Sequence, residues 1–252
     1  MHIDLSDKRT LVTGASRGIG EAIAIQLVKS GATVAAHYNK NPVKTDHLTY
    51  EQLKKLVPIK ADLSSPSETS ALFDKVIDRF GHLDVIINNA GIAIKSSMEG
   101  DINHFVNDWK NTMDVNLLAT GILCKHAINH FVGRNGGIII NISSRAAFRG
   151  DTPDYLAYAA SKGGIVALTR SIARAYGKQG IVAFNVAPGF VKTDMAQDAI
   201  DAYGEGFVKD DIALNDLTQP QDLAPLITLL ASGLANHATG GTFDINAGSY
   251  VH

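Results

Sequence analysis

Short, mainly apolar runs alternate along the chain with longer amphipathic segments of helical length. The apolar runs fall at residues 10–13, 33–37, 57–60, 85–88, 137–142, 181–187 and 242–246. The helical segments fall at residues 19–30, from 66 to about 80, within 108–132, and at 155–176. Strands that alternate with helices are typical of an α/β fold in which helices cover both faces of a parallel sheet. The pattern therefore predicts a doubly wound parallel sheet, which we expect to form a single domain over residues 1–252.

Capping residues define the ends of some predicted helices. Ser65 is placed as an N-cap before Pro66, and Glu68 is placed to complete a capping box with Ser65. Gly81 follows the same helix and favours a left-handed C-terminal cap. Residues 190–216, by contrast, show no clean period, so we predict that this segment covers the substrate.

The composition indicates a globular protein that binds neither nucleic acid nor a membrane. Hydrophobic residues make up 45% of the 252 positions, which is enough to fill a core. The 23 Lys and Arg against 25 Asp and Glu include no basic block that would bind the phosphates of a nucleic acid. A single cysteine excludes an internal disulfide and favours a reducing compartment. Because the sequence shows no signal-like leader and no apolar run of membrane length, we expect a cytoplasmic protein.

A glycine-rich loop follows the first predicted strand and opens the next helix. Its glycines have the spacing G-x-x-x-G-x-G, which differs from the commoner G-x-G-x-x-G fingerprint. Glycines at such a turn let the backbone approach a dinucleotide pyrophosphate, and the positive end of the helix dipole attracts its charge. A plain strand-to-helix turn is the alternative for so short a motif. The predicted contacts in this loop are Gly14, Ser16, Arg17, Gly18, Ile19 and Gly20.

The residues after the second predicted strand indicate which dinucleotide is bound. An acidic residue there would bind the ribose 2′-hydroxyl of NAD, whereas cations would accept the 2′-phosphate of NADP. Residues 37–40 read HYNK, and the first acidic residue afterwards is Asp46. Arg17 and Lys40 could converge on a phosphate, so NADP(H) is favoured over NAD(H), with Asn39 and Lys40 as contacts.

Tyr158 and Lys162 lie four residues apart in a predicted helix, so their side chains share one helical face. A free phenol has a pKa of about 10, which is too high for ready proton exchange at neutral pH. A neighbouring ammonium would lower that pKa, as a general acid/base requires. Tyr155 is a rival for this role, but its fourth neighbour is Ala159. The spacing therefore predicts an acid/base centre at Tyr158.

Three further motifs accompany this pair. Residues 141–144 (NISS) end a predicted strand, where α/β sheets bind their ligands. Residues 88–91 (NNAG) follow the fourth strand, and residues 114–117 (DVNL) lie in the long predicted helix. Together with the glycine loop and the Tyr158–Lys162 pair, these motifs resemble the short-chain dehydrogenase/reductase family over nearly the whole chain. The resemblance implies a Rossmann-like fold and an oxidoreductase that acts on a CH–OH or C=O group.

The resemblance also implies a role for each residue of the catalytic set. Tyr158 would be the general acid/base, and Lys162 would lower its pKa and bind the nicotinamide ribose. Ser144 would polarise the carbonyl; it is preferred to Ser143 because the family's serine is usually the later of the two. Asn116 would hold a water that links Lys162 to solvent. Further cofactor contacts implied in the same way are Asn89, Ala90, Gly91, Asp62, Leu63, Pro188, Gly189, Val191 and Thr193.

Within the family, residues 189–195 and 246–250 look like those of 3-oxoacyl-carrier-protein reductases, but sugar and polyol dehydrogenases are also similar. An acyl-carrier partner needs a basic patch, and only scattered Arg134, Arg174 and Lys178 are available. We therefore expect a small carbonyl or alcohol substrate without naming it, and the resemblance implies a homo-oligomer, a tetramer. The alternatives are a non-catalytic nucleotide-binding regulator and an epimerase or dehydratase, of which the last two usually need a longer chain.

Two other features of the sequence are of types found in metal sites or nucleophiles. His126 and His130 have a spacing that could ligate zinc, but no glutamate stands between them in the protease pattern and no third ligand is evident. Cys124, on the same predicted helix, is typical of a small core residue. We expect no metal site.

Overall fold

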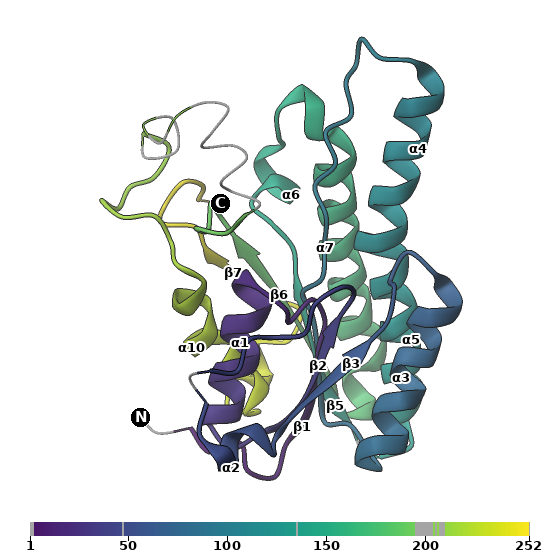
Figure 1. The fold of residues 1–252 in the computed structure, drawn as a ribbon, viewed down its shortest axis with the longest axis vertical. Helices are drawn as coiled ribbons and strands as arrows, with labels where there is room; N and C mark the ends of the chain where they lie inside the picture. Colours follow the sequence, from purple (N-terminus) through teal and green to yellow (C-terminus); the bar gives the residue numbers. More distant parts are fainter. Residues whose placement is uncertain are drawn as a thin grey trace.

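The computed structural model describes residues 3–46, 48–134, 136–194, 204, 206 and 210–251. Over these residues seven parallel strands form one sheet in the order β3-β2-β1-β4-β5-β6-β7 (Figure 1). The strands are β1 (Arg9–Val12), β2 (Thr33–Tyr38), β3 (Leu56–Lys60), β4 (Val85–Asn88), β5 (Gly137–Ile142), β6 (Ile181–Pro188) and β7 (Thr242–Ile245). Each strand overlaps one apolar run of the sequence, and the parallel sheet confirms the predicted α/β fold.

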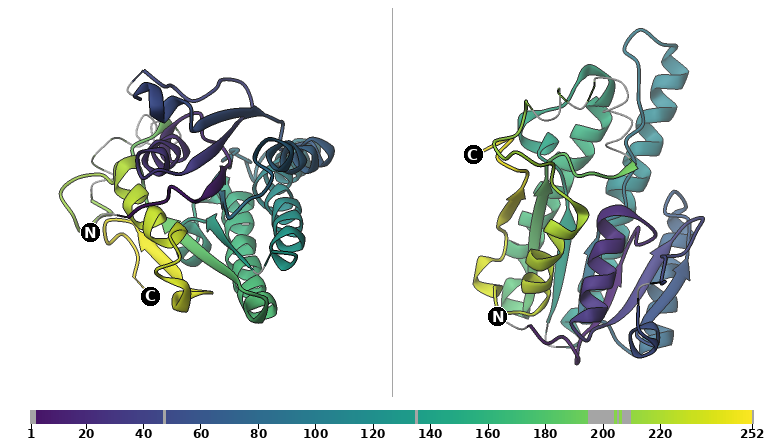
Figure 2. Two further views of the ribbon diagram at one scale, coloured as in Figure 1. Left: turned by 90° about the horizontal axis from the view of Figure 1, so that it is seen from below. Right: turned by 60° about the vertical axis from the view of Figure 1, so that its left-hand side comes forward.

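Helices cover both faces of the sheet (Figure 1, Figure 2). The helices are α1 (Gly18–Lys29) and α10 (Pro220–Ala231) on one face, and α3 (Pro66–Phe80), α5 (Ala119–Val132) and α7 (Leu156–Tyr176) on the other. Successive side chains of a strand point to opposite faces. Ile87 and Ile140 therefore pack toward α1 and α10, whereas Ile86 and Ile139 pack toward α3, α5 and α7. All four isoleucines are fully buried, so both faces contribute a core.

The long helix predicted within residues 108–132 is instead two α-helices joined by a π-helical segment. The first is α4 (Ile102–Met113), which begins before the predicted region because the Asp101 carboxylate caps its first-turn amides. The π-helical segment, Asp114–Leu118, leads directly into α5. No capping side chain or break in the helical dihedrals marks either end of the π-helical segment, so the sequence shows one helix where the structure has two.

Shorter helices complete the described chain. They are α2 (Tyr50–Leu53), α6 (Ala146–Arg149) and the 3₁₀ turns Pro153–Tyr155, Gly177–Gln179 and Asn236–Ala238. The helix α10 is absent from the predicted elements, although Pro220 in its first turn and a capping box between Gln219 and Asp222 mark its start. None of the described helices is both long enough and apolar enough to cross a membrane.

The start of α3 differs in one contact from the prediction. Ser65 is the N-cap, and its hydroxyl accepts a hydrogen bond from the Glu68 amide at 3.3 Å. Glu68 does not complete the predicted capping box, because its carboxylate accepts a hydrogen bond from the Asp62 amide at 2.9 Å instead. This bond fixes the loop after β3. Gly81 ends α3 with a φ of +75°, the left-handed cap that the sequence predicts.

Because all seven strands are parallel, their carboxyl ends meet at one edge of the sheet. The segments that leave β1, β2 and β4 contain the glycine loop, Asn39 and Asn89, respectively. Those that leave β5 and β6 contain Ser144 and Gly189. Residues predicted to bind the cofactor or the substrate therefore gather along this edge, where open α/β sheets bind ligands.

Candidate active site

A cavity of about 530 Å³ opens at the carboxyl edge of the sheet. Its wall is built from the segments that follow β4, β5 and β6, from α6, and from the beginning of α7. The predicted site residues that line it are Ile19, Asn89, Gly91, Ser144, Tyr158, Lys162, Pro188, Gly189, Val191 and Thr193. The structure therefore brings together side chains predicted from five separate segments of the sequence.

The other predicted site residues do not line this cavity. They are Gly14, Ser16, Arg17, Gly18, Gly20, Asn39, Lys40, Asp62, Leu63, Ala90 and Asn116. Most of them extend along the same sheet edge toward β3, as expected for an elongated dinucleotide. Asn116 differs from the rest, because it is buried behind the cavity wall.

Tyr158 and Lys162 lie on the face of α7 that borders the cavity. Lys162 is buried, its ammonium donates to the Ile142 carbonyl at 3.0 Å, and its Nζ lies 5.7 Å from the centroid of the Tyr158 ring. Burial lowers the pKa of Lys162 to about 8. Burial likewise raises the pKa of Tyr158 to about 12, and the charge of Asp151 adds to this effect while a hydrogen bond with Ser144 opposes it. The phenol is therefore protonated at neutral pH.

The two neighbouring serines have different partners. The Ser143 hydroxyl donates to the Val186 carbonyl of β6 at 3.2 Å. The Ser144 hydroxyl accepts a hydrogen bond from the Ala146 amide at 3.1 Å and is also hydrogen-bonded to Tyr158. Both serines are buried in the cavity wall, but only Ser144 contacts the tyrosine hydroxyl among the described residues.

Asn116 is placed by the π-helical segment that joins α4 to α5. Its Oδ1 accepts a hydrogen bond from the Ile92 amide at 2.8 Å, and its Nδ2 donates to the Ile92 carbonyl at 2.9 Å and to Ser161 at 3.0 Å. A Cβ at Gly91 would lie 3.3 Å from both Asn116 Oδ1 and Lys162 Nζ. Asn116 therefore ties the loop after β4 to α7 beside the lysine, and its water-holding role stays a prediction.

The glycine loop has the close packing that a pyrophosphate cradle requires. Gly14 has a φ of +65°, and a Cβ at Gly20 would lie only 2.1 Å from the Gly14 carbonyl oxygen. The first turn of α1 begins at Arg17 without a side-chain cap. Uncapped helix amides next to a backbone that only glycine permits suit an anionic pyrophosphate. The residues present thus fit a dinucleotide.

Thr13 and His37 support this loop and were not among the predicted site residues. The Thr13 hydroxyl accepts hydrogen bonds from the amides of Asn89 and Ala90 at 2.9 and 3.0 Å. His37 Nδ1 accepts a hydrogen bond from the Gly14 amide at 3.0 Å, and its Nε2 lies 3.1 Å from the Ala61 carbonyl. Burial lowers the pKa of His37, which keeps the ring neutral. A polar residue inside an apolar strand was the signal that could have identified both.

The residues predicted to select NADP lie on the exposed side of the loop. Arg17 forms an ion pair with Asp194 at 2.8 Å, and both side chains are exposed. Asn39 and Lys40 are exposed directly after β2. After β3, the Asp62 carboxylate accepts hydrogen bonds from Ser64, which lower the pKa of Asp62. The Arg17 guanidinium is therefore directed to the Asp194 carboxylate and not toward Lys40.

The cavity is also lined by residues that were not among the predicted site residues. They are Arg145, Arg149, Asp151, Thr152, Tyr155, Phe190 and Asp211. Of the predicted substrate cover, residues 190–194, 204, 206 and 210–216 are described, and residues 195–203, 205 and 207–209 lie outside the described chain. Phe190, Val191, Thr193 and Asp211 of this segment line the cavity.

The two histidines considered for zinc each have a packing role. His126 Nε2 is hydrogen-bonded to the Ser70 hydroxyl at 2.7 Å, and His130 Nε2 accepts a hydrogen bond from the Leu83 amide at 3.1 Å. Cys124 is buried, which raises the pKa of its thiol to about 12. Within the described ranges, no three His, Cys, Asp or Glu side chains are grouped to hold a metal ion.

Comparison with known proteins agrees with this geometry. Residues 8–204 match the family described as short chain dehydrogenase. The 3-oxoacyl-[acyl-carrier-protein] reductase FabG of Staphylococcus aureus (strain Mu50 / ATCC 700699) is 35% identical over 247 residues, which cover 97% of this chain and 98% of that protein. Glucose 1-dehydrogenase 2 of Bacillus subtilis (strain 168) is 32% identical over 257 residues, which cover 100% of this chain and 98% of that protein.

Two solved structures are similar over almost the whole chain. The NADPH-dependent 3-quinuclidinone reductase from Rhodotorula rubra has a TM-score of 0.89 and 25% identity, covering 98% of this chain and 93% of that one. The NADH-dependent reductase A1-R′ responsible for alginate metabolism has a TM-score of 0.85 and 28% identity, covering 98% and 100%. Both are reductases, but their names specify different nicotinamide cofactors.

Proposed function

The chain belongs to the short chain dehydrogenase family and is an oxidoreductase acting on a CH–OH or C=O group, and from this premise we propose that it reduces a carbonyl with NADPH, or oxidises the matching alcohol, using Tyr158 as general acid/base. The observation that carries the proposal is the contact set at the cavity. Tyr158 is hydrogen-bonded to Ser144 and lies over Lys162, and all three line one cavity.

In the reductive direction, Tyr158 donates its phenolic proton to the carbonyl oxygen of the substrate. Ser144 donates a hydrogen bond to the same oxygen and so stabilises the negative charge that develops there. The Lys162 ammonium stabilises the tyrosinate that is left behind. When bound, the dihydronicotinamide would supply the hydride, and Lys162 would hold its ribose. Alcohol oxidation uses the same groups in reverse, with the tyrosinate accepting the proton.

The glycine loop, Asn89 to Gly91 and the Pro188 to Thr193 segment are proposed to hold the dinucleotide. Support for NADP(H) comes from Lys40, which is exposed directly after β2, and from the lack of a carboxylate there. Arg17 joins Lys40 in binding a 2′-phosphate only on leaving its ion pair with Asp194. The two similar solved structures are named for different cofactors, NADPH and NADH. Our preference for NADP(H) therefore rests on the cations of this chain.

Within the family, a 3-oxoacyl thioester is our substrate candidate, supported by the similarity to the Staphylococcus reductase. A sugar substrate is the alternative, supported by the similarity to the Bacillus glucose dehydrogenase. For the assembly and its location, the resemblance supports a cytoplasmic homotetramer. Mass measurement of the purified protein in solution would test the tetramer.

The reaction is tested by following NADPH and NADH consumption with a panel of ketones, keto-sugars and oxoacyl thioesters. Replacing Tyr158 with Phe should lower kcat/KM at least about a hundredfold, because the proton donor is removed. Tyr155→Phe is the matched control, since it removes a hydroxyl from the same cavity. Equal losses in the two variants, or an unchanged rate in Tyr158→Phe, would contradict the assignment.

A further inference from the structure

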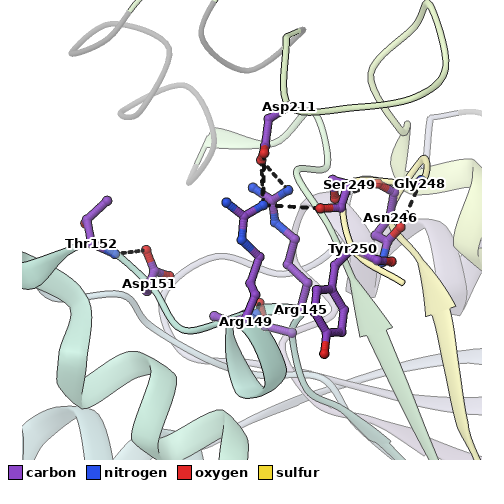
Figure 3. Close-up of polar contacts among 11 residues, drawn as sticks. Arg145, Arg149, Asp151, Thr152, Asp211, Asn246, Gly248, Ser249 and Tyr250 are labelled. Carbon is purple, nitrogen blue, oxygen red and sulfur yellow. Dashed lines mark hydrogen bonds and ion pairs between the residues drawn. The ribbon is translucent and has the colours of Figure 1, made fainter. Parts of the chain in front are cut away.

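Two arginines line the cavity beside Ser144 and Tyr158, and the proposed hydride transfer assigns no role to either. Arg145 follows Ser144 directly in the chain, and Arg149 is the last residue of α6. Figure 3 shows their side chains next to each other, with both guanidinium groups directed toward Asp211. Arg145 is only 8% exposed, so the cavity wall contains a nearly buried cation.

Asp211 demonstrates that this pair can hold a carboxylate. Arg145 Nη1 and Arg149 Nη1 both donate to Asp211 Oδ2, and Arg149 Nη1 also donates to Asp211 Oδ1 at 3.0 Å and to the Ser249 carbonyl at 3.2 Å. These bonds use one terminal nitrogen of each side chain. A guanidinium has five N–H donors, and within the described part of the chain the remaining donors of this pair have no acceptor. The pair can therefore accept further carboxylate oxygens.

The charges around the arginines do not balance through ion pairs alone. Two guanidinium groups share the single carboxylate of Asp211. Asp151 lies on the other side of Arg149 in Figure 3, and among the described residues its carboxylate accepts a hydrogen bond from Thr152 without forming an ion pair. Burial raises the pKa of Asp151, and the charges of Arg145 and Arg149 oppose that rise. A partly desolvated cation without a full partner favours an anionic ligand.

We propose that Arg145 and Arg149 bind a carboxylate of the substrate, so that the enzyme prefers oxo acids over neutral carbonyl compounds. This inference rests on the proposed reaction at Ser144 and Tyr158, because the carbonyl must lie there while the carboxylate lies at the arginines. It favours a free oxo acid over the oxoacyl thioester, which has no carboxylate at the acyl end. Ser144, Arg145 and Arg149 line the same cavity, so one small molecule can present a carbonyl and a carboxylate to them. Arginine is suited to this role because its planar fork binds both oxygens of a carboxylate. Asp211 competes for the same donors.

The test compares substrates that differ only in charge. The probes are acetoacetate and 4-oxopentanoate, each against its methyl ester, and the quantity measured is the acid-to-ester ratio of kcat/KM. We expect the wild-type enzyme to favour the acids at least about tenfold, since charge-assisted hydrogen bonds are lost with the ester. Arg149→Gln should lower the ratio at least about tenfold. Asp211→Asn should raise it, because the competing carboxylate is gone.

Opposite changes in these two variants distinguish substrate binding from a purely structural ion pair. If the ion pairs only hold α6 to Asp211, Arg149→Gln and Asp211→Asn both weaken this contact, and each changes kcat/KM for the acid and for the ester by the same factor. That outcome, or a wild-type ratio near one, overturns the inference. The matched control is Arg79→Gln, which removes an exposed arginine of α3 outside the cavity and should leave the ratio unchanged.

Binding without turnover separates this inference from the proposed reaction. Calorimetric titration with pentanoate and with pentanamide, in the presence of saturating NADP⁺, needs no hydride transfer. Binding of pentanoate that is weakened at least about tenfold in Arg149→Gln supports the carboxylate site even when no probe is reduced. Equal affinity for the acid and the amide overturns it. Lack of reduction with every carbonyl in the panel would instead contradict the proposed function.

Discussion

At the scale of single residues, burial acts against the charged forms of both members of the Tyr158–Lys162 pair. It raises the pKa of Tyr158 to about 12 and lowers that of Lys162 to about 8. Below about pH 8 the lysine is an ammonium that can stabilise the tyrosinate, and above this value the charge is lost. The value of kcat/KM for carbonyl reduction should therefore be level up to about pH 8 and fall at higher pH.

This pH profile is checked by steady-state kinetics from about pH 6 to about pH 10. Lys162→Arg provides the comparison, because a guanidinium stays charged throughout that range and should remove the alkaline decline. A wild-type profile that stays level across pH 8 would show that the ionisation of Lys162 does not control reduction.

Gly20 makes the steric requirement of the cofactor loop testable. A Cβ at this position would lie 2.1 Å from the Gly14 carbonyl oxygen and 2.5 Å from Asn89 Nδ2, so Gly20→Ala must displace the loop. We expect the Kd for NADPH, measured by fluorescence titration, to rise at least about tenfold, which corresponds to about 1.4 kcal/mol. Gly121→Ala is the matched control, because the space around Gly121 in α5 is open. The idea fails if both variants bind NADPH as the wild type does.

At the scale of elements, a polar network crosses the apolar face of the sheet between β4, β5 and α7. Asn141 is fully buried in β5; its Oδ1 accepts a hydrogen bond from Asn88 at 2.8 Å, and its Nδ2 donates to Thr169 at 2.9 Å. Asn141→Leu would remove two buried side-chain hydrogen bonds. The free energy of unfolding, measured in urea, should fall by about 1–3 kcal/mol or more. Asn129→Leu, at an exposed position of α5, should change it by less than about 0.5 kcal/mol.

The strands β1, β2, β4, β5 and β6 were predictable because each is a short apolar run that is largely buried on both faces. The edge strands β3 and β7 are apolar runs that include exposed residues. Parallel order followed from the helices between them. The helix α10 was missed although Pro220 and Asp222 mark its start, because Pro225 inside it is a residue that usually ends a helix. The π-helical segment that carries Asn116 was missed for a physical reason: its junctions with α4 and α5 keep helical dihedrals, and no capping side chain marks where it begins or ends.

At the scale of the whole molecule, the cofactor loop and the Tyr158–Lys162 pair were visible in the sequence because each is local. The three glycines of the loop lie within residues 14–20, and Tyr158 and Lys162 are one helical turn apart. The substrate side of the cavity is different. Arg145 and Asp211 are separated by 66 residues and meet only because two loops leave the same sheet edge. No local pattern encodes that contact, so only the fold reveals the arginine pair.

The stability of the whole chain should fall in mild acid because three histidines resist protonation in the folded state. Burial lowers the pKa of His37, His82 and His130 below the ordinary value of 6.5. His37 and His130 also use a ring nitrogen to accept a backbone amide hydrogen bond, which protonation would abolish. As the pH falls below about 6.5, the unfolded chain binds protons that the folded chain does not, so the free energy of unfolding decreases.

Urea unfolding at about pH 7.5 and about pH 5 measures this effect. The decrease should be smaller in His37→Gln, because that variant has one fewer group whose pKa is lowered by folding. His104→Gln is the matched control, since His104 lies exposed on α4 and its loss should leave the pH dependence as it is in the wild type. A free energy of unfolding that is constant or rises as the pH falls between these two values would contradict the lowered pKa values of the three rings, and with them the hydrogen bond by which neutral His37 holds Gly14 in the cofactor loop.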